Sequence, residues 1–411
     1  MIKIKAIFLL PGLFFVFFLT SQVVAKQQSG QHSGHRQFSN PNRISSVGTD
    51  EKSNAFFIAV RKGDIDVMKD LLATGTSIHI RNSHKRTALM EASFHNQKEI
   101  VSWLLHKGVD PNAEDEQKRT ALMFAIRNNN VDITKELLNF GADPALVDAE
   151  GHNGLFWSAG SGNQEILRLF IHRDMDVNRR DNRGLSPLLL ALASGQDNTA
   201  QLLIENGADI NVKLPKSLET PLTLAARFSE IGIVEMLIEK GADVNLGNSG
   251  RVTPLMVACT RGDIGLIGLL LAKGSDTNAK SITGWTPLTY AINKKHHSVV
   301  KLLIEHGAKL DDTDSRGTTP LMLASAIGDG RSVNILIQSG AQIDLQDKRG
   351  FTALMASASK GHNEIVRDLL KHSASLETVD VKGRSALDWA VSKKQDVTAS
   401  ILRNKTPQNG G

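Results

Sequence analysis

Apolar and polar positions along this 411-residue chain repeat with a period of 33 residues. Each period is marked by a Thr or Ser followed by Ala or Pro and then Leu. These marker residues are Thr87, Thr120, Ser186, Thr220, Thr253, Thr286, Thr319, Thr352 and Ser385. Asn153 fills the slot after Thr120, and Asn54 stands 33 residues before Thr87. The pattern predicts eleven copies over residues 54–403, and such a fixed period indicates a stacked array.

The copy that begins at Thr319 shows which elements one period predicts. Thr319 is a good helix N-cap, and Pro320 suits the first helical position because that position needs no N–H. Gly328 ends this first helix, and Gly340 ends a second helix as a C-cap that tolerates a positive φ. An extended stretch near Ile343 then leads into a turn before the next marker. We call the loop that precedes each marker a finger.

Two motifs resemble the ankyrin repeat. The motif Thr-Pro-Leu-x-x-Ala occupies 220–225, 253–258, 286–291 and 319–324, and Leu-Ile/Leu-x-x-Gly-Ala-Asp occupies 137–143, 203–209 and 237–243. The resemblance covers roughly 350 of the 411 residues. It implies an all-α solenoid of about eleven helix-turn-helix units joined by hairpin-like fingers, each unit being stable only when stacked on its neighbours.

Two copies depart from the pattern. Repeat 4, counted from residue 54, has Asn153 in the marker slot and Asp174 where the C-cap glycine belongs, so we expect a weaker unit or a bend there. The step from Ser186 to Thr220 is 34 residues rather than 33. The extra residue falls near Pro215, and we expect it to lengthen one finger.

The two ends of the chain differ from the array. Residues 1–25 contain two lysines, an uncharged apolar run of 14 residues and a small-residue site, which predicts a cleavable signal peptide. The alternative is an uncleaved membrane anchor, although the run is short for a spanning helix. Residues 26–53 read as a flexible polar linker and 404–411 as a polar tail. We therefore expect an exported, periplasmic protein, with secretion as the alternative.

The sequence offers little material for catalysis. The repeats leave no room for a separate catalytic domain, so we expect no enzyme activity, no cofactor and no metal. Cys259 is the only cysteine, which excludes an internal disulfide. It falls where sister repeats have Ser or Ala, and we expect a buried core thiol.

The resemblance also implies where a partner binds, since the finger tips and the exposed end of the first helix form the concave face of such arrays. These positions lie four, three and one residues before each marker slot of repeats 2–11 and seven and eight residues after it. The fifty positions hold fifteen Lys or Arg and three acids, whereas the rest of residues 26–411 has 31 basic and 40 acidic residues. Clustered charge of one sign attracts partners of the opposite sign. The predicted partner-binding residues are Arg86, Arg119, Arg127, Arg227, Arg261, Trp285, Lys294, Arg316, Lys348, Arg349, Phe351, Lys360, Lys382 and Arg384.

These observations predict a monomeric protein–protein interaction scaffold whose partner has an acidic surface, centred on repeats 8–11. Three alternatives stay open: a binder of polyanions such as glycans, lipid headgroups or nucleic acid, a periplasmic accessory factor for an enzyme, and a secreted host-directed effector. Nucleic acid is disfavoured because residues 26–411 are nearly neutral overall. We expect no membrane span once the signal is removed.

Overall fold

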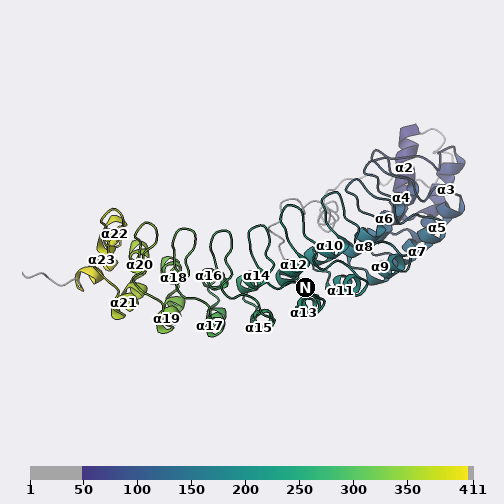
Figure 1. The fold of residues 1–411 in the computed structure, drawn as a ribbon. Helices are drawn as coiled ribbons and strands as arrows, with labels where there is room; N and C mark the ends of the chain where they lie inside the picture. Colours follow the sequence, from purple (N-terminus) through teal and green to yellow (C-terminus); the bar gives the residue numbers. More distant parts are fainter. Residues whose placement is uncertain (1–48, 406–411) are drawn as a thin grey trace, which may run out of the picture.

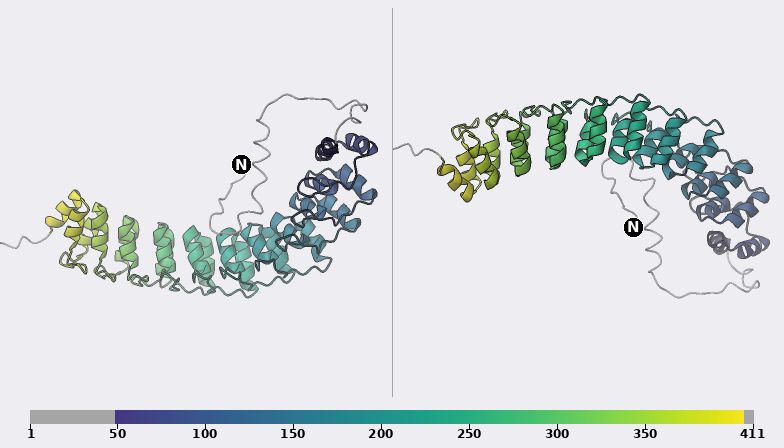
Figure 2. Two further views of the ribbon diagram at one scale, coloured as in Figure 1. Left: turned by 90° about the horizontal axis from the view of Figure 1, so that it is seen from above. Right: turned by 90° about the horizontal axis from the view of Figure 1, so that it is seen from below.

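The computed structural model describes residues 49–405, which fold into eleven pairs of α-helices stacked in one curved row (Figure 1). Within this range there is no β-strand, so the predicted all-α solenoid is confirmed. Figure 2 shows the curvature from two further directions. The predicted signal peptide, most of the linker and most of the tail lie outside the described residues.

The first helix of each pair lies on the inner side of the curve, next to the fingers (Figure 1). These inner helices are α2 (Thr49–Lys62), α4 (Ala88–Phe94), α6 (Ala121–Arg127), α8 (Gly154–Ser161), α10 (Pro187–Ala193), α12 (Pro221–Phe228), α14 (Pro254–Arg261), α16 (Pro287–Asn293), α18 (Pro320–Ala326), α20 (Ala353–Lys360) and α22 (Ala386–Ser392). Helix α2 begins five residues before Asn54, so residues 49–53 are helical.

The second helix of each pair lies on the outer side of the curve. The outer helices are α3 (Ile65–Ala73), α5 (Lys98–His106), α7 (Val131–Asn139), α9 (Gln164–Ile171), α11 (Asp197–Glu205), α13 (Ile231–Glu239), α15 (Ile264–Ala272), α17 (His297–Glu305), α19 (Gly330–Gln338), α21 (Asn363–Lys371) and α23 (Asp396–Arg403). None of the helices in residues 49–405 has both the length and the apolar character needed to cross a membrane.

All of the marker residues except Thr120 cap their helices through a side-chain hydrogen bond, as the sequence predicts. The Thr319 hydroxyl accepts a hydrogen bond from the Met322 N–H at 3.2 Å, and the Asn153 amide oxygen accepts one from the Phe156 N–H at 3.1 Å. Either side-chain oxygen satisfies an N–H that the first helical turn leaves without a partner. The irregular marker of repeat 4 therefore preserves the helix start.

The inner helices supply most of the core. Every residue of α10 is buried, and the large side chains of Phe124 on α6 and Phe156 on α8 are fully buried as well. Cys259 on α14 is buried as well, and this burial raises the pKa of its thiol. Small residues on the inner helices let neighbouring pairs approach closely, so each repeat is stabilised by the apolar surface of the next.

Backbone hydrogen bonds join neighbouring fingers. The Lys348 N–H donates to the Arg316 carbonyl at 3.0 Å, for example, and the equivalent bond occurs between all other neighbouring fingers of repeats 2–11 except those of repeats 5 and 6. Pro215 stands where repeat 6 should supply the donor, and proline has no N–H. The extra residue predicted near Pro215 does lie in this finger, and the proline ring packs against Gly184 of the preceding finger.

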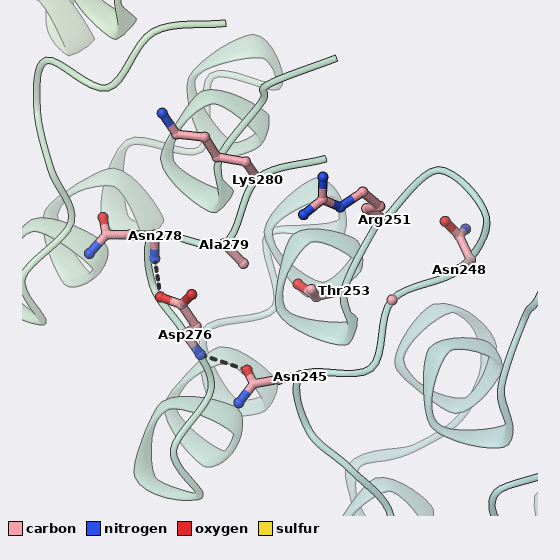
Figure 3. A pocket seen from close by; sticks show the side chains of 9 residues that line it. Asn245, Asn248, Arg251, Thr253, Asp276, Asn278, Ala279 and Lys280 are labelled. Atoms are coloured by element: carbon pink, nitrogen blue, oxygen red, sulfur yellow. Dashed lines mark hydrogen bonds between the residues drawn. The ribbon is translucent and has the colours of Figure 1, made fainter. Parts of the chain in front are cut away.

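A second set of links lies at the finger bases (Figure 3). The Asn245 amide accepts a hydrogen bond from the Asp276 N–H at 2.7 Å and donates to the Gly274 carbonyl at 3.2 Å. Asn112, Asn178 and Asn278 make the same pair of bonds to their next repeats. Asn211 occupies the equivalent place in repeat 6, but its side chain makes neither bond among the described residues.

We expect Asn245→Ala to lower the free energy of unfolding by about 1–2 kcal/mol, because two hydrogen bonds between repeats 7 and 8 are lost. Asn211→Ala is the matched control, since both side chains are exposed and only Asn245 links two repeats. It should change the free energy of unfolding by less than about 0.5 kcal/mol. Urea unfolding followed by circular dichroism measures both, and equal losses would contradict a role for the amide link.

Candidate protein-interaction surface

The predicted partner-binding residues lie on the fingers and at the carboxyl ends of the inner helices. On the fingers are Arg86, Arg119, Trp285, Arg316, Lys348, Arg349, Phe351, Lys382 and Arg384. At or just beyond helix ends are Arg127, Arg227, Arg261, Lys294 and Lys360. Fingers and inner helices share the inner side of the curve (Figure 1), so the stacking brings these positions onto one face.

Most finger arginines are paired with a buried aspartate of their own finger. Arg349 lies 2.9 Å from Asp347, and Arg384 lies 2.7 Å from Asp380. Arg119 with Asp115 and Arg316 with Asp314 repeat the arrangement. The same aspartates accept two backbone N–H groups each, which shapes the finger. Much of the arginine charge is therefore balanced inside the fold.

The environment of these aspartates favours their charged form. Burial by itself raises the pKa of Asp380, but hydrogen bonds from Arg384, from backbone N–H groups and from Trp389 outweigh it and leave the pKa well below the usual range. Asp314 behaves in the same way, with a pKa lowered by backbone N–H groups and Arg316. The aspartate stands five residues before the marker, a position outside the predicted contact set.

The lysines are different, because they are exposed and make no ion pair within residues 49–405. These lysines are Lys294, Lys348, Lys360 and Lys382, all in repeats 8–11. Arg316 and Arg349, though paired, keep 72% and 71% of their side-chain surface exposed. Among the predicted partner-binding residues, the exposed positive charge is therefore concentrated in the last four repeats.

Aromatic side chains lie among these charges. The rings of Trp285 and Tyr290 meet edge to face at 5.4 Å, and with Thr283 and Arg316 they line an open recess of about 400 Å³. The rings of Phe351 and Trp389 make a similar pair at 5.1 Å. Tyr290 and Trp389 stand four residues after their markers and were not among the predicted contacts.

Two of the predicted residues are hydrogen-bonded inside the array, one across a repeat boundary and one within its own repeat. Arg261 donates to the Ala226 carbonyl at 2.8 Å, across the boundary between repeats 6 and 7. Arg227 donates to the buried carboxylate of Glu219 at 3.0 Å. These guanidinium groups satisfy partners inside the array, so less of their hydrogen-bonding capacity is available to a ligand than the sequence suggests.

His152 of repeat 4 is a buried link between two fingers. Its Nδ1 lies 3.3 Å from Asp148 of the same finger, and its Nε2 lies 3.1 Å from Asp181 of the next finger. Burial alone lowers the pKa of His152, but the hydrogen bonds to the two aspartates outweigh it and raise the pKa to about 9. The histidine is therefore charged at neutral pH.

No group of three or more His, Cys, Asp or Glu in residues 49–405 is arranged to hold a metal ion.

Eleven stacked helix pairs with finger loops define a helical solenoid, a class of protein that uses an extended inner face for binding. A family model described as ankyrin repeats (3 copies) matches overlapping stretches at 28–115, 56–148, 122–214, 215–281, 255–347 and 321–409. The chain belongs to the ankyrin-repeat family. A search of curated proteins found no match.

Ankyrin repeats are generally protein–protein interaction modules, and the family is typically non-enzymatic. This general role agrees with the predicted scaffold.

Proposed function

We propose that this protein is a non-enzymatic scaffold that binds an acidic surface of a protein partner through the inner face of repeats 8–11. The observation that carries the proposal is the set of exposed lysines without an ion pair in that region: Lys294, Lys348, Lys360 and Lys382. A paired arginine must share its charge with its aspartate, whereas these ammonium groups can turn toward a carboxylate of the partner.

The aromatic pairs give this surface apolar contacts between the charges. Aromatic and arginine side chains contribute most to binding in typical protein interfaces. Trp285 with Tyr290 and Phe351 with Trp389 therefore form two anchoring positions, separated along the array by repeat 9. An acidic segment with interspersed apolar residues matches this alternation.

For the compartment, we infer export to the periplasm from the apolar run in residues 1–25.

Changing Lys348, Lys360 and Lys382 to Glu tests the proposal, since none of the three side chains makes an ion pair that folding would lose. The matched control changes Lys69, Lys301 and Lys371 to Glu, which are exposed on outer helices and alter the net charge equally. A cross-linked partner is first recovered from the native envelope fraction with the protein as bait. Its affinity is then measured at two salt concentrations.

We expect the inner-face variant to bind the partner at least about tenfold more weakly and to lose most of the salt dependence. The control variant should stay within about twofold of the unchanged protein. Unchanged affinity in the inner-face variant would refute the proposal. Retention on heparin well above physiological salt, with no protein partner recovered, would favour a polyanion ligand instead.

A further inference from the structure

Three arginines of repeats 2 and 3 gather around two aromatic rings on the inner face. The Cζ atoms of Arg86 and Arg119 lie 4.7 Å and 5.0 Å from the centre of the Phe124 ring. The Cζ atom of Arg127 lies 5.7 Å from the centre of the Phe94 ring. The two rings meet edge to face at 5.7 Å, so the guanidinium groups share one aromatic support.

Two buried carboxylates balance part of this charge. Asp115 accepts both Nε and Nη2 of Arg119, at 2.9 Å and 2.8 Å, and two backbone N–H groups. Glu91 accepts the Asn82 amide at 3.0 Å and lies 3.4 Å from Nη1 of Arg86. Both carboxylates therefore already accept hydrogen bonds from groups other than Arg127.

Arg127 makes no hydrogen bond or ion pair through its guanidinium within residues 49–405. Burial, and then the nearby charges of Arg119 and Arg86, lower the pKa of Arg127. Arg61 also approaches Glu91, at 3.9 Å, so four arginines face two carboxylates and two positive charges are in excess. Burial lowers the pKa of the nearby His95, which favours its neutral form.

We propose that Arg127, together with Arg86 and Arg119, forms a binding site for a carboxylate side chain of an acidic protein partner. A guanidinium presents N–H donors in a planar fork that matches a carboxylate. The rings behind the arginines keep water from one side of the site, which strengthens the attraction. The inference rests on the proposed function, since the carboxylate would belong to the same acidic partner, but the site lies far along the array from repeats 8–11.

The probe is a dye-labelled, acetylated and amidated penta-glutamate peptide, with penta-glutamine as the neutral control. Binding is measured by fluorescence anisotropy in the full chain that already carries Glu at positions 348, 360 and 382, so that three of the four unpaired lysines of repeats 8–11 are removed. We compare Arg127→Gln with Arg331→Gln, which removes an exposed arginine from the outer helix α19. Arg127→Gln should weaken penta-glutamate binding about tenfold and Arg331→Gln by less than twofold.

Thermal unfolding separates binding from a structural role. Without a ligand, Arg127→Gln should raise the unfolding midpoint or leave it unchanged, because it removes a half-buried cation that other arginines repel. Unchanged penta-glutamate affinity in Arg127→Gln overturns the inference, and so does a lowered midpoint, since that assigns Arg127 to stability. Competition by inorganic phosphate at lower concentration than by acetate also overturns it, in favour of a phosphate ligand. None of these results bears on repeats 8–11.

Discussion

Replacing His152 with alanine is expected to lower the free energy of unfolding by about 3–5 kcal/mol, because it leaves the buried carboxylate of Asp148 without a cation and Asp181 with only Arg183. The imidazole joins Asp148 and Asp181 at 3.3 Å and 3.1 Å, and only 6% of its side-chain surface is exposed. It also stacks on Phe156, with ring centres 5.1 Å apart. The loss therefore combines charge, hydrogen bonding and packing.

His84→Ala is the matched control for this change. His84 lies 3.1 Å from Glu116 of the next finger, but the two side chains are 61% and 43% exposed. Exposed pairs contribute little because water screens them, so we expect a loss below about 1 kcal/mol. Urea unfolding followed by tryptophan fluorescence measures both variants. A loss for His152→Ala no larger than that for His84→Ala would contradict the role given to burial.

The same pair of contacts makes stability depend on pH. The folded pKa of His152, about 9, lies above the ordinary histidine pKa of 6.5, so the folded protein holds the proton more tightly. The stabilisation is complete below about pH 6.5 and is lost as the pH rises toward 9. The unchanged protein should lose about 3 kcal/mol over this interval, and His152→Ala should lose much less. Identical pH profiles would exclude His152 as the source.

Replacing Gly284 with alanine is expected to cost about 3 kcal/mol, because the new methyl group meets the backbone of the next finger. Gly284 has φ +81°, and a Cβ there would lie 2.8 Å from both Asp314 Cα and Ser315 N. The left-handed conformation alone costs a residue with a side chain about 1–2 kcal/mol. The remaining loss comes from pushing apart fingers that the bond from Ser315 N–H to the Thr283 carbonyl holds at 2.9 Å.

Gly274→Ala isolates the conformational part of this cost. Gly274 has a similar φ of +87°, but no atom lies within 4 Å of its added Cβ. We expect it to lose about 1 kcal/mol. The recess formed by Trp285 and Arg316 spans the two fingers that Gly284→Ala displaces, so only this variant should also bind the partner less tightly. Equal unfolding losses in the two variants would show that contact between fingers is not limiting.

The period of 33 residues was sufficient to predict the helix pairs and most of the caps, because each depends on residues close in sequence, whereas the position of the inner face came from the resemblance to ankyrin repeats. Thr319 caps its helix through a residue three positions away. The irregular finger at Pro215 could also be located by counting. The spacing of the repeats could not predict which charges are paired. Arg349 forms an ion pair with Asp347, and this contact depends on the folded shape of the finger.

Repeat 4 contains a stabilising contact that the sequence could not predict. Its sequence predicts a weak unit or a bend, because the marker is Asn153 and the C-cap glycine is replaced. His152 and Asp181 are 29 residues apart, and their contact exists only once repeats 4 and 5 have stacked. Tyr290 and Trp389 were missed for a related reason: their position reads as the core face of a helix, yet the fingers leave it partly open.

Because Pro215 lacks an N–H, the row of backbone hydrogen bonds between fingers is divided into two blocks. Backbone hydrogen bonds run from finger to finger within repeats 2–5 and within repeats 6–11, but none of them crosses between the two blocks in residues 49–405, where Asn178 still joins the finger bases. Arg127 lies in the first block and Lys348 in the second. A ligand that contacts both blocks therefore bridges the boundary that lacks a backbone hydrogen bond between fingers, and adds a connection there to the side-chain bonds of Asn178.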